Sequence, residues 1–204
     1  MEGCRAVSAS VDLYWLPLGA GGHFVRLNGR LYEAAAALRA RRRPSALYHS
    51  ALEVRLDGER YVIEMAPVWN EHAPERGVVA EGVVGSRLAG RLRLFRYEVR
   101  CWLHGRIPDV AEAVDSPRRL ASDSARARCV LDRVREVPTP LWGRDELQTG
   151  DMWNSNSVVS WLVVRCGLGG EPVLPPPGGR APGWDAGRAI ARRAHSDSAL
   201  TTSD

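Results

Sequence analysis

The amino-acid sequence predicts an α+β fold, in which an antiparallel sheet packs against helices. Two segments with alternating apolar and polar residues, 48–55 and 60–66, flank residues 57–58, an Asp-Gly pair typical of a hairpin turn. A third alternating segment covers residues 92–103. Apolar side chains then recur at helical spacing over residues 156–165. This order of a helix, clustered strands and later helices favours a mixed, largely antiparallel layout.

The size of the chain favours one domain. The sequence has 204 residues with ordinary apolar content, so we expect a single α+β domain over residues 1–194 and a disordered tail over residues 195–204. No apolar run approaches the roughly 20 residues that a membrane span requires. The N-terminus lacks the basic-then-apolar layout of a secretory signal, which predicts a cytoplasmic protein.

The charged residues argue against a nucleic-acid partner. The formal net charge is +4, and the one tight basic cluster is Arg39, Arg41, Arg42 and Arg43. This cluster lies at the end of a predicted helix, where the helix dipole favours cations. A nucleic-acid-binding protein needs a broader basic face with aromatic residues between the charges, and the sequence shows none.

The cysteines do not predict a metal site. None of Cys4, Cys101, Cys129 and Cys166 forms a Cys-x-x-Cys pair, and no histidine lies at ligand spacing from them. We therefore expect no metal and no cofactor. Unpaired, mostly buried thiols in a reducing compartment fit this spacing best.

The remaining elements are predicted from periodicity and from Gly and Pro. An early strand covers residues 11–18, and a turn at Gly19–Gly22 leads to a short second strand. The sequence then predicts an irregular stretch at 67–90 and a helical region that Ser116-Pro117 opens. The other predicted elements are a strand at 23–27, a helix at 29–43, a helix at 121–134 with Ala125, Cys129, Val130 and Val134 buried, and a short segment at 184–193.

The predicted hairpin brings two polar side chains near each other. A two-residue turn at Asp57-Gly58 pairs residues whose numbers sum to about 115. His49 and Glu64 then become diagonal neighbours on one face, within reach of each other. A carboxylate beside an imidazole fixes the tautomer and raises the basicity of the imidazole. The alternative is a cross-strand polar pair on a solvated face.

A polar stretch precedes the late apolar helix. Either Asn154 or Ser155 occupies the N-cap position, beside unpaired backbone N–H groups and the positive end of the helix dipole. The same geometry can activate a nucleophile and stabilise an oxyanion. Serine and asparagine at this position more often serve as caps alone.

These features resemble a known superfamily. The segment 47–54, with His49 on a strand, is followed by Glu64 on the next strand and by Asn-Ser-Asn-Ser-Val at 154–158. This order resembles the circularly permuted papain-like superfamily, which includes lecithin:retinol acyltransferase-like proteins, PPPDE peptidases and permuted NlpC-type hydrolases. It is also similar to an uncharacterised bacterial branch with Asn-Ser-Asn-Ser/Thr at the second motif. The resemblance covers about residues 45–166 and places Ser155 where these families have cysteine.

The resemblance implies a hydrolase or acyltransferase acting on an amide or ester of a small molecule, peptide or lipid. Ser155 would attack, His49 would accept its proton and Glu64 would orient His49. Residues expected to help are Asn154 and Asn156 at the oxyanion, and Trp153, Trp69 and His23 along the substrate cleft. The alternative is a catalytically inactive binding domain of the same fold. A nucleic-acid or regulatory partner protein is a third possibility, which the sequence supports least.

Overall fold

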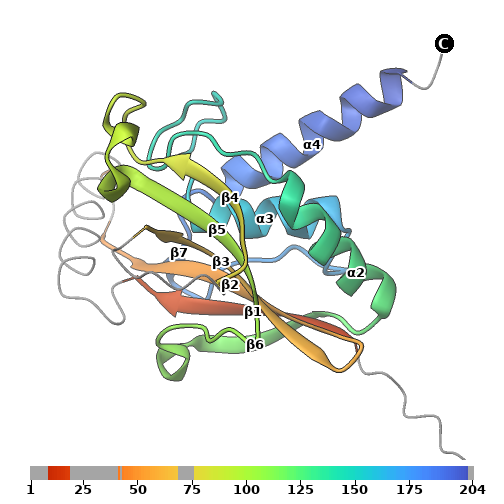
Figure 1. The fold of residues 1–204 in the computed structure, drawn as a ribbon. Helices are drawn as coiled ribbons and strands as arrows, with labels where there is room; N and C mark the ends of the chain where they lie inside the picture. The colour runs from red at the N-terminus through yellow and green to blue at the C-terminus, as the bar shows by residue number, and fades with distance from the viewer. Residues whose placement is uncertain (1–8, 19–40, 42, 69–75, 202–204) are drawn as a thin grey trace, which may run out of the picture.

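The structure, a computed structural model, describes residues 9–18, 41, 43–68 and 76–201, with side chains described as far as residue 194. It has the predicted α+β architecture, in which one seven-stranded sheet packs against three helices of the described part (Figure 1). The strands are β1 Ser10–Pro17, β2 Ala46–Leu56, β3 Glu59–Pro67, β4 Val78–Val83, β5 Arg96–Leu103, β6 Val114–Ala121 and β7 Gly179–Arg180. The helices are α2 Ser124–Arg133, α3 Ser155–Arg165 and α4 Trp184–Thr201.

The sheet is antiparallel along its main path. The strand order is β4-β5-β3-β2-β1-β6, and the short β7 pairs with β2 in parallel. The β2–β3 hairpin confirms the predicted register, because Leu52 pairs with Ile63 and Val54 with Tyr61. Its turn residue Asp57 has a φ of 53°. Gly58, which follows, also has a positive φ, as this type of tight hairpin turn requires.

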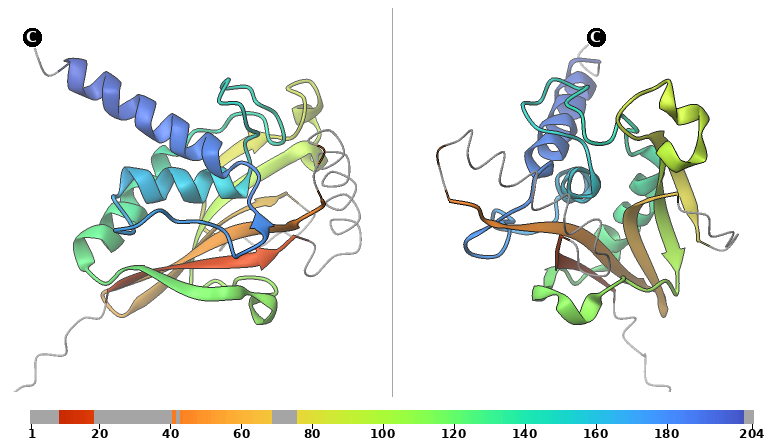
Figure 2. Two further views of the ribbon diagram at one scale, coloured as in Figure 1. Left: turned by 180° about the vertical axis from the view of Figure 1, so that it is seen from behind. Right: turned by 90° about the vertical axis from the view of Figure 1, so that its left-hand side faces the viewer.

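The sheet divides at one end of this hairpin. The pairing of β2 with β3 stops at Leu52 and Ile63. Beyond that point β2 continues along β1, where Tyr48 pairs with Pro17, and β3 continues along β5. The two halves of the sheet therefore separate at the end that carries the early residues of β2 and the late residues of β3 (Figure 2).

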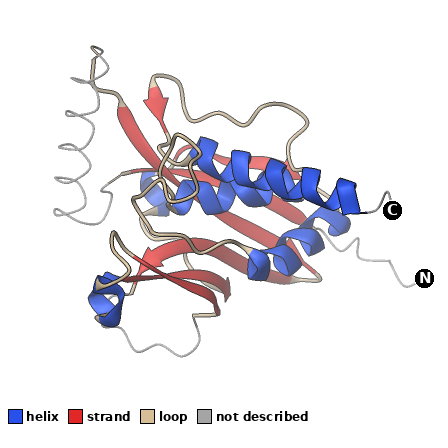
Figure 3. Ribbon diagram, turned by 90° about the horizontal axis from the view of Figure 1, so that it is seen from above, coloured by secondary structure: helices blue, strands red, loops and turns tan. Residues whose placement is uncertain are grey.

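The main core lies between the helices and one face of the sheet (Figure 3). Alternate residues of β1 and β2 point into it, and helix α3 is buried along almost its whole length. Trp15 contacts Trp184 with ring centroids 4.8 Å apart, which fixes the start of α4 against β1. The opposite face of the sheet carries a smaller apolar cluster of Leu16, Ala51, Val62 and Ile107.

Helices α3 and α4 approach each other at Gly187. A Cβ atom at this position would collide with the carbonyl oxygen of Ser157 and with the hydroxyl of Ser160. We expect Gly187→Ala to lower the free energy of unfolding by about 1–3 kcal/mol, because a packed helix pair cannot absorb an added methyl group. Thermal denaturation tests this. Gly170→Ala is the matched control, since no atom lies within 4 Å of its Cβ position and we expect little change there.

Three segments differ from their predictions. The stretch expected to be irregular contains β4, which adds to the sheet by pairing with β5. Residues 92–95 form a turn rather than the start of β5. Residues 114–121 form strand β6 rather than the start of a helix. Pro117 lacks a backbone N–H, and it fits β6 because this strand lies at the edge of the sheet.

The helix boundaries also differ from prediction. Helix α2 begins at Ser124, where Asp123 accepts a hydrogen bond from the backbone N–H of Arg126. It buries Ala127 rather than the expected Ala125. Helix α4 runs to Thr201, into the segment predicted to be disordered. The strand predicted at 23–27 and the helix predicted at 29–43 lie outside the described residues, apart from positions 41 and 43.

The expectation of unpaired thiols is wrong for two cysteines. Cys129 of α2 and Cys166 at the end of α3 form a disulfide. Sequence spacing does not reveal this bond, because it depends on how the two helices pack. Cys101 is free, and burial raises the pKa of its thiol to about 11, so it stays protonated at neutral pH.

Candidate active site

The N-terminus of α3 is held by a complete capping arrangement. Asn154 is the N-cap, and its Oδ1 accepts a hydrogen bond of 2.9 Å from the backbone N–H of Asn156. In return, the backbone N–H of Asn154 donates to Oγ of Ser157 over 3.0 Å. The predicted cap at this position is therefore confirmed at Asn154.

The two asparagines connect α3 to the rest of the fold. Nδ2 of Asn156 donates to the carbonyl oxygens of Tyr48 (2.9 Å) and Pro182 (2.8 Å), and its Oδ1 accepts from Oγ of Ser50 at 2.8 Å. Nδ2 of Asn154 also donates to Pro182 at 2.8 Å. The side-chain amide of Asn156 thus has both of its N–H groups engaged in structural hydrogen bonds, and its backbone N–H, near which the sequence predicted the oxyanion donors, donates to Asn154.

Ser155 differs from the serines around it. Oγ of Ser157 donates to the carbonyl oxygen of Gly183, and Oγ of Ser160 donates to that of Ser157. Ser50 donates to Asn156. Within the described part of the chain, the hydroxyl of Ser155 makes no hydrogen bond, although the residue is buried. Capping and packing therefore account for its neighbours but leave the hydroxyl of Ser155 without a structural role.

Ser155 lies on the wall of two adjoining cavities, of about 190 Å³ and 170 Å³. Both cavities are lined by Leu18, His49, Trp142 and Ser155. The larger one also contacts Glu64 and apolar residues of β3, and the smaller one extends toward Pro182. The structure thus brings together the three residues for which the sequence predicts catalytic roles.

The separation of β2 from β3 explains why these residues share a cavity. In a continuous sheet, Ser50 and His49 would point to opposite faces. The larger cavity nevertheless contacts both of them, together with both Glu64 and Met65 of β3. Because β2 and β3 diverge beyond Leu52 and Ile63, the space between them opens to residues of either face.

His49 is neutral at physiological pH. Burial lowers the pKa of its imidazole to about 4, and the Asp109 carboxylate opposes this shift only in part. Among the described residues, the imidazole has no hydrogen-bond partner. One of its nitrogens is therefore a free proton acceptor at the cavity wall.

Glu64 is held by arginine rather than by histidine. Nη1 of Arg100 donates to Oε1 of Glu64 over 3.1 Å, and Nε of Arg100 donates to Glu98 over 2.9 Å. Arg76 lies 3.6 Å from Glu98 and extends this buried network. Burial raises the pKa of Glu64, and the charges of Arg100 and Arg76 oppose that shift. The orienting hydrogen bond from Glu64 to His49 that the sequence suggested is not formed in the described structure.

The aromatic wall differs from the expected one. Trp153 is only 2% exposed, belongs to the main core and lines neither cavity. Trp142 takes that place, held by backbone bridges to Val84 and to Trp153. In the sequence, Trp142 lies between Pro140 and Gly143, outside any periodic segment, and this loop position could have marked it as a wall residue. The predicted cleft residues His23 and Trp69 lie outside the described residues.

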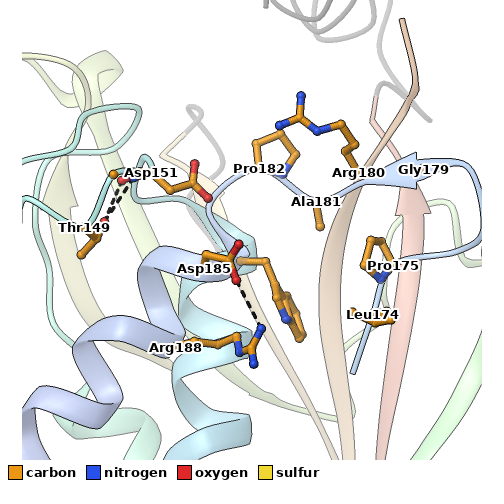
Figure 4. A pocket seen from close by; sticks show the side chains of 12 residues that line it. Thr149, Asp151, Leu174, Pro175, Gly179, Arg180, Ala181, Pro182, Asp185 and Arg188 are labelled. Atoms are coloured by element: carbon orange, nitrogen blue, oxygen red, sulfur yellow. Dashed lines mark hydrogen bonds and ion pairs between the residues drawn. The ribbon is translucent and has the colours of Figure 1, made fainter. Parts of the chain in front are cut away.

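A third cavity, of about 530 Å³, lies beside the start of α4 (Figure 4). Its charged side chains already have partners. Asp185 pairs with Arg188 on the helix, and Asp151 accepts a hydrogen bond of 2.7 Å from the backbone N–H of Gly183. We regard it as a polar crevice between loops, because these groups join parts of the chain to each other.

Comparison of the chain with protein-family models, with curated proteins and with solved structures gives no match. Among the described residues, no group of three or more histidine, cysteine, aspartate or glutamate side chains could hold a metal ion. None of the helices described is long and apolar enough to cross a membrane. The α+β fold class therefore comes from the structure alone, and a function can be inferred only from the residues of the site.

Proposed function

We propose that the chain is a hydrolase or acyltransferase in which Ser155 attacks an ester or amide and His49 accepts its proton. One observation carries this proposal. Ser155 and His49 come from distant parts of the sequence, line the same two cavities and make no hydrogen bond in the described structure, whereas the polar side chains beside Ser155 are engaged. An unused hydroxyl and an unused proton acceptor at one cavity wall suit nucleophilic catalysis.

The reaction would proceed in two steps. Oγ of Ser155 forms a bond to the acyl carbon while its proton passes to His49, which then gives the proton to the leaving group as the bond between that group and the acyl carbon breaks. Water or an acceptor nucleophile then attacks the acyl carbon and loses its proton to His49, which passes it to Oγ of Ser155 as the bond between Oγ and the acyl carbon breaks. The backbone N–H of Ser155 has no hydrogen-bond partner within the described residues and lies in the first turn of α3. It is our candidate donor to the oxyanion.

The proposal is a Ser–His dyad, because Arg100 holds the carboxylate of Glu64. Glu64 still lines the larger cavity, where Arg100 balances its negative charge. The sequence order, with His49 first and the nucleophile last at a helix N-terminus, is that of the permuted papain-like proteins. We include membership of that superfamily in the proposal.

The second candidate is a binding domain that performs no chemistry. The low pKa of His49, about 4, favours it, because a base works best when its pKa lies near the working pH. In that case, the cavities bind an apolar ligand and Ser155→Ala leaves its affinity unchanged. The two candidates differ in whether Ser155 reacts with an electrophile.

The pH dependence of fluorophosphonate labelling tests the role of His49. A base with a pKa of about 4 is unprotonated above pH 5, so we expect a labelling rate that is flat from pH 5 to 8 and falls as the pH drops through about 4. His49→Ala should remove this step and slow labelling across the flat range from pH 5 to 8. His104→Ala is the control, because the His104 side chain is exposed and pairs with Glu59.

A rate that rises continuously with pH in the wild type, unchanged in His49→Ala, would show that hydroxide rather than His49 activates the serine. The absence of any labelling of folded wild type would favour the binding domain.

A further inference from the structure

The turn before β5 exposes an unusual number of large apolar side chains. It consists of two short 3-10 helices, η1 Ala89–Arg91 and η2 Arg93–Phe95, and projects at one end of the molecule (Figure 1). Its apolar side chains are largely open to solvent: Leu88 is 80% exposed, Leu92 and Leu94 are each 62% exposed, and Phe95 is 38% exposed. We call residues 87–95 the projecting turn. Such a concentration of exposed apolar groups marks an interaction surface.

Hydrogen bonds hold the projecting turn in this shape. The backbone N–H of Leu92 donates to the carbonyl oxygen of Ala89, and that of Phe95 donates to Leu92, both over 2.9 Å. Nε of Arg96 donates to the carbonyl oxygen of Gly90 over 2.7 Å. Gly90 is buried, and a Cβ atom there would collide with the side chain of Val83. The backbone of the turn thus packs against the protein at Gly90, while the leucine side chains remain exposed to solvent.

The charges on the projecting turn are all positive. Residues 87–95 contain three arginines and no acidic residue. Arg87 is paired with Glu146. Arg91 and Arg93 are exposed and have no ion-pair partner within the described part of the chain. Two free guanidinium groups therefore alternate with the exposed leucines.

We propose that the projecting turn docks on an anionic lipid surface. Leucine and phenylalanine side chains insert at the boundary of the acyl chains, and Arg91 and Arg93 bind lipid phosphates above them. Alternation of apolar and cationic residues on a convex projection suits a lipid interface, which needs no complementary groove. Because Arg91 and Arg93 are positively charged, we expect the projecting turn to prefer anionic lipid to neutral lipid.

The projecting turn is connected to the cavity wall. The backbone N–H of Gly85 donates to the carbonyl oxygen of Trp142 over 3.0 Å, and Arg87 pairs with Glu146 on the same loop. A docked protein would therefore hold the loop of Trp142 close to the lipid surface. The lipid-binding inference does not depend on catalysis by Ser155, and it is tested without any substrate.

Co-sedimentation with vesicles tests the inference. We compare vesicles of phosphatidylcholine alone with vesicles that also contain phosphatidylglycerol, and expect the full chain to bind the latter. Leu92→Ser with Leu94→Ser should weaken binding more than about tenfold through lost apolar burial. Arg91→Gln with Arg93→Gln should weaken it by about fivefold for each arginine removed, and added salt should have a similar effect.

The controls lie at the opposite end of β5. Leu103 is also exposed, and Arg106 follows it without an ion pair in the described structure, so Leu103→Ser and Arg106→Gln should bind like the wild type. Circular dichroism confirms that each variant is folded. Failure of the wild type to bind anionic vesicles, or unchanged binding by the projecting-turn variants, would overturn the inference. Self-association in analytical ultracentrifugation that only the leucine variants lose would also overturn it, in favour of a contact between two copies.

Discussion

Ser155→Ala is expected to abolish fluorophosphonate labelling and to lower ester hydrolysis at least about a thousandfold. The alanine removes a hydroxyl that makes no hydrogen bond in the described structure, so the fold loses little. Rates with activated p-nitrophenyl esters of short acyl chains measure the effect. Short chains are chosen because the two cavities are small, about 190 Å³ and 170 Å³.

Two further variants separate chemistry from structure. Ser160 lies on the same helix, is fully buried and donates to the carbonyl oxygen of Ser157, so Ser160→Ala should keep its activity even if it melts earlier. Ser155→Cys keeps a nucleophilic atom at the site and should react with iodoacetamide faster than Cys101 does. Equal hydrolysis by wild type and Ser155→Ala would remove Ser155 from the mechanism.

Arg100→Met is expected to lower the free energy of unfolding by about 3–5 kcal/mol at pH 7. Arg100 is the partner of two carboxylates, the half-buried Glu64 at 3.1 Å and the buried Glu98 at 2.9 Å. Without it, Glu64 keeps no ion pair among the residues that the structure describes, and Glu98 has Arg76 at 3.6 Å. Urea denaturation measures the loss.

The loss should shrink as the pH falls. Burial already raises the pKa of Glu64, and removal of Arg100 raises it further. A group whose pKa is higher in the folded state favours folding at low pH and loses that contribution as the pH rises through its folded value. The variant should therefore approach wild-type stability in acid. Arg128→Met is the control, because Arg128 and Asp57 are both exposed and such pairs contribute little. An equal loss for both variants would contradict the assigned role of Arg100.

Local patterns were sufficient to predict the hairpin and the helix cap. The Asp57-Gly58 turn and the alternation on either side determine the register, because a one-residue slip would expose the buried face. Asn154 could be predicted as a cap from its place before an apolar helix. These predictions depend on residues close to one another in sequence, and the structure confirms them.

Long-range packing explains the predictions that failed. From the sequence, Pro117 suggests the start of a helix. In the fold it lies in strand β6, which can contain a proline because β6 is an edge strand. The disulfide of Cys129 and Cys166 depends on how α2 lies against the end of α3. Strand β4 forms because β5 offers it a free edge, which its own short sequence does not indicate.

In the site too, the features that local sequence predicts differ from those that depend on long-range packing. The sequence predicts roles for Ser155 and His49 from their positions at a helix N-terminus and on a strand, and both line the same cavities. It does not predict that β2 and β3 diverge, which opens one cavity to residues of both faces. Nor does it predict that Arg100 holds Glu64, since Arg100 lies on β5 and reaches Glu64 through strand pairing. Trp142, on a loop, becomes a wall residue only once the sheet has formed.

The most direct test of the account is to map the fluorophosphonate adduct by tandem mass spectrometry. The folded wild-type chain is labelled at neutral pH, digested and sequenced. We predict one adduct, on the peptide that begins α3, with the added mass on Ser155. An adduct on any other residue, or none on Ser155 after prolonged labelling of the folded chain, would contradict a nucleophilic role for this serine.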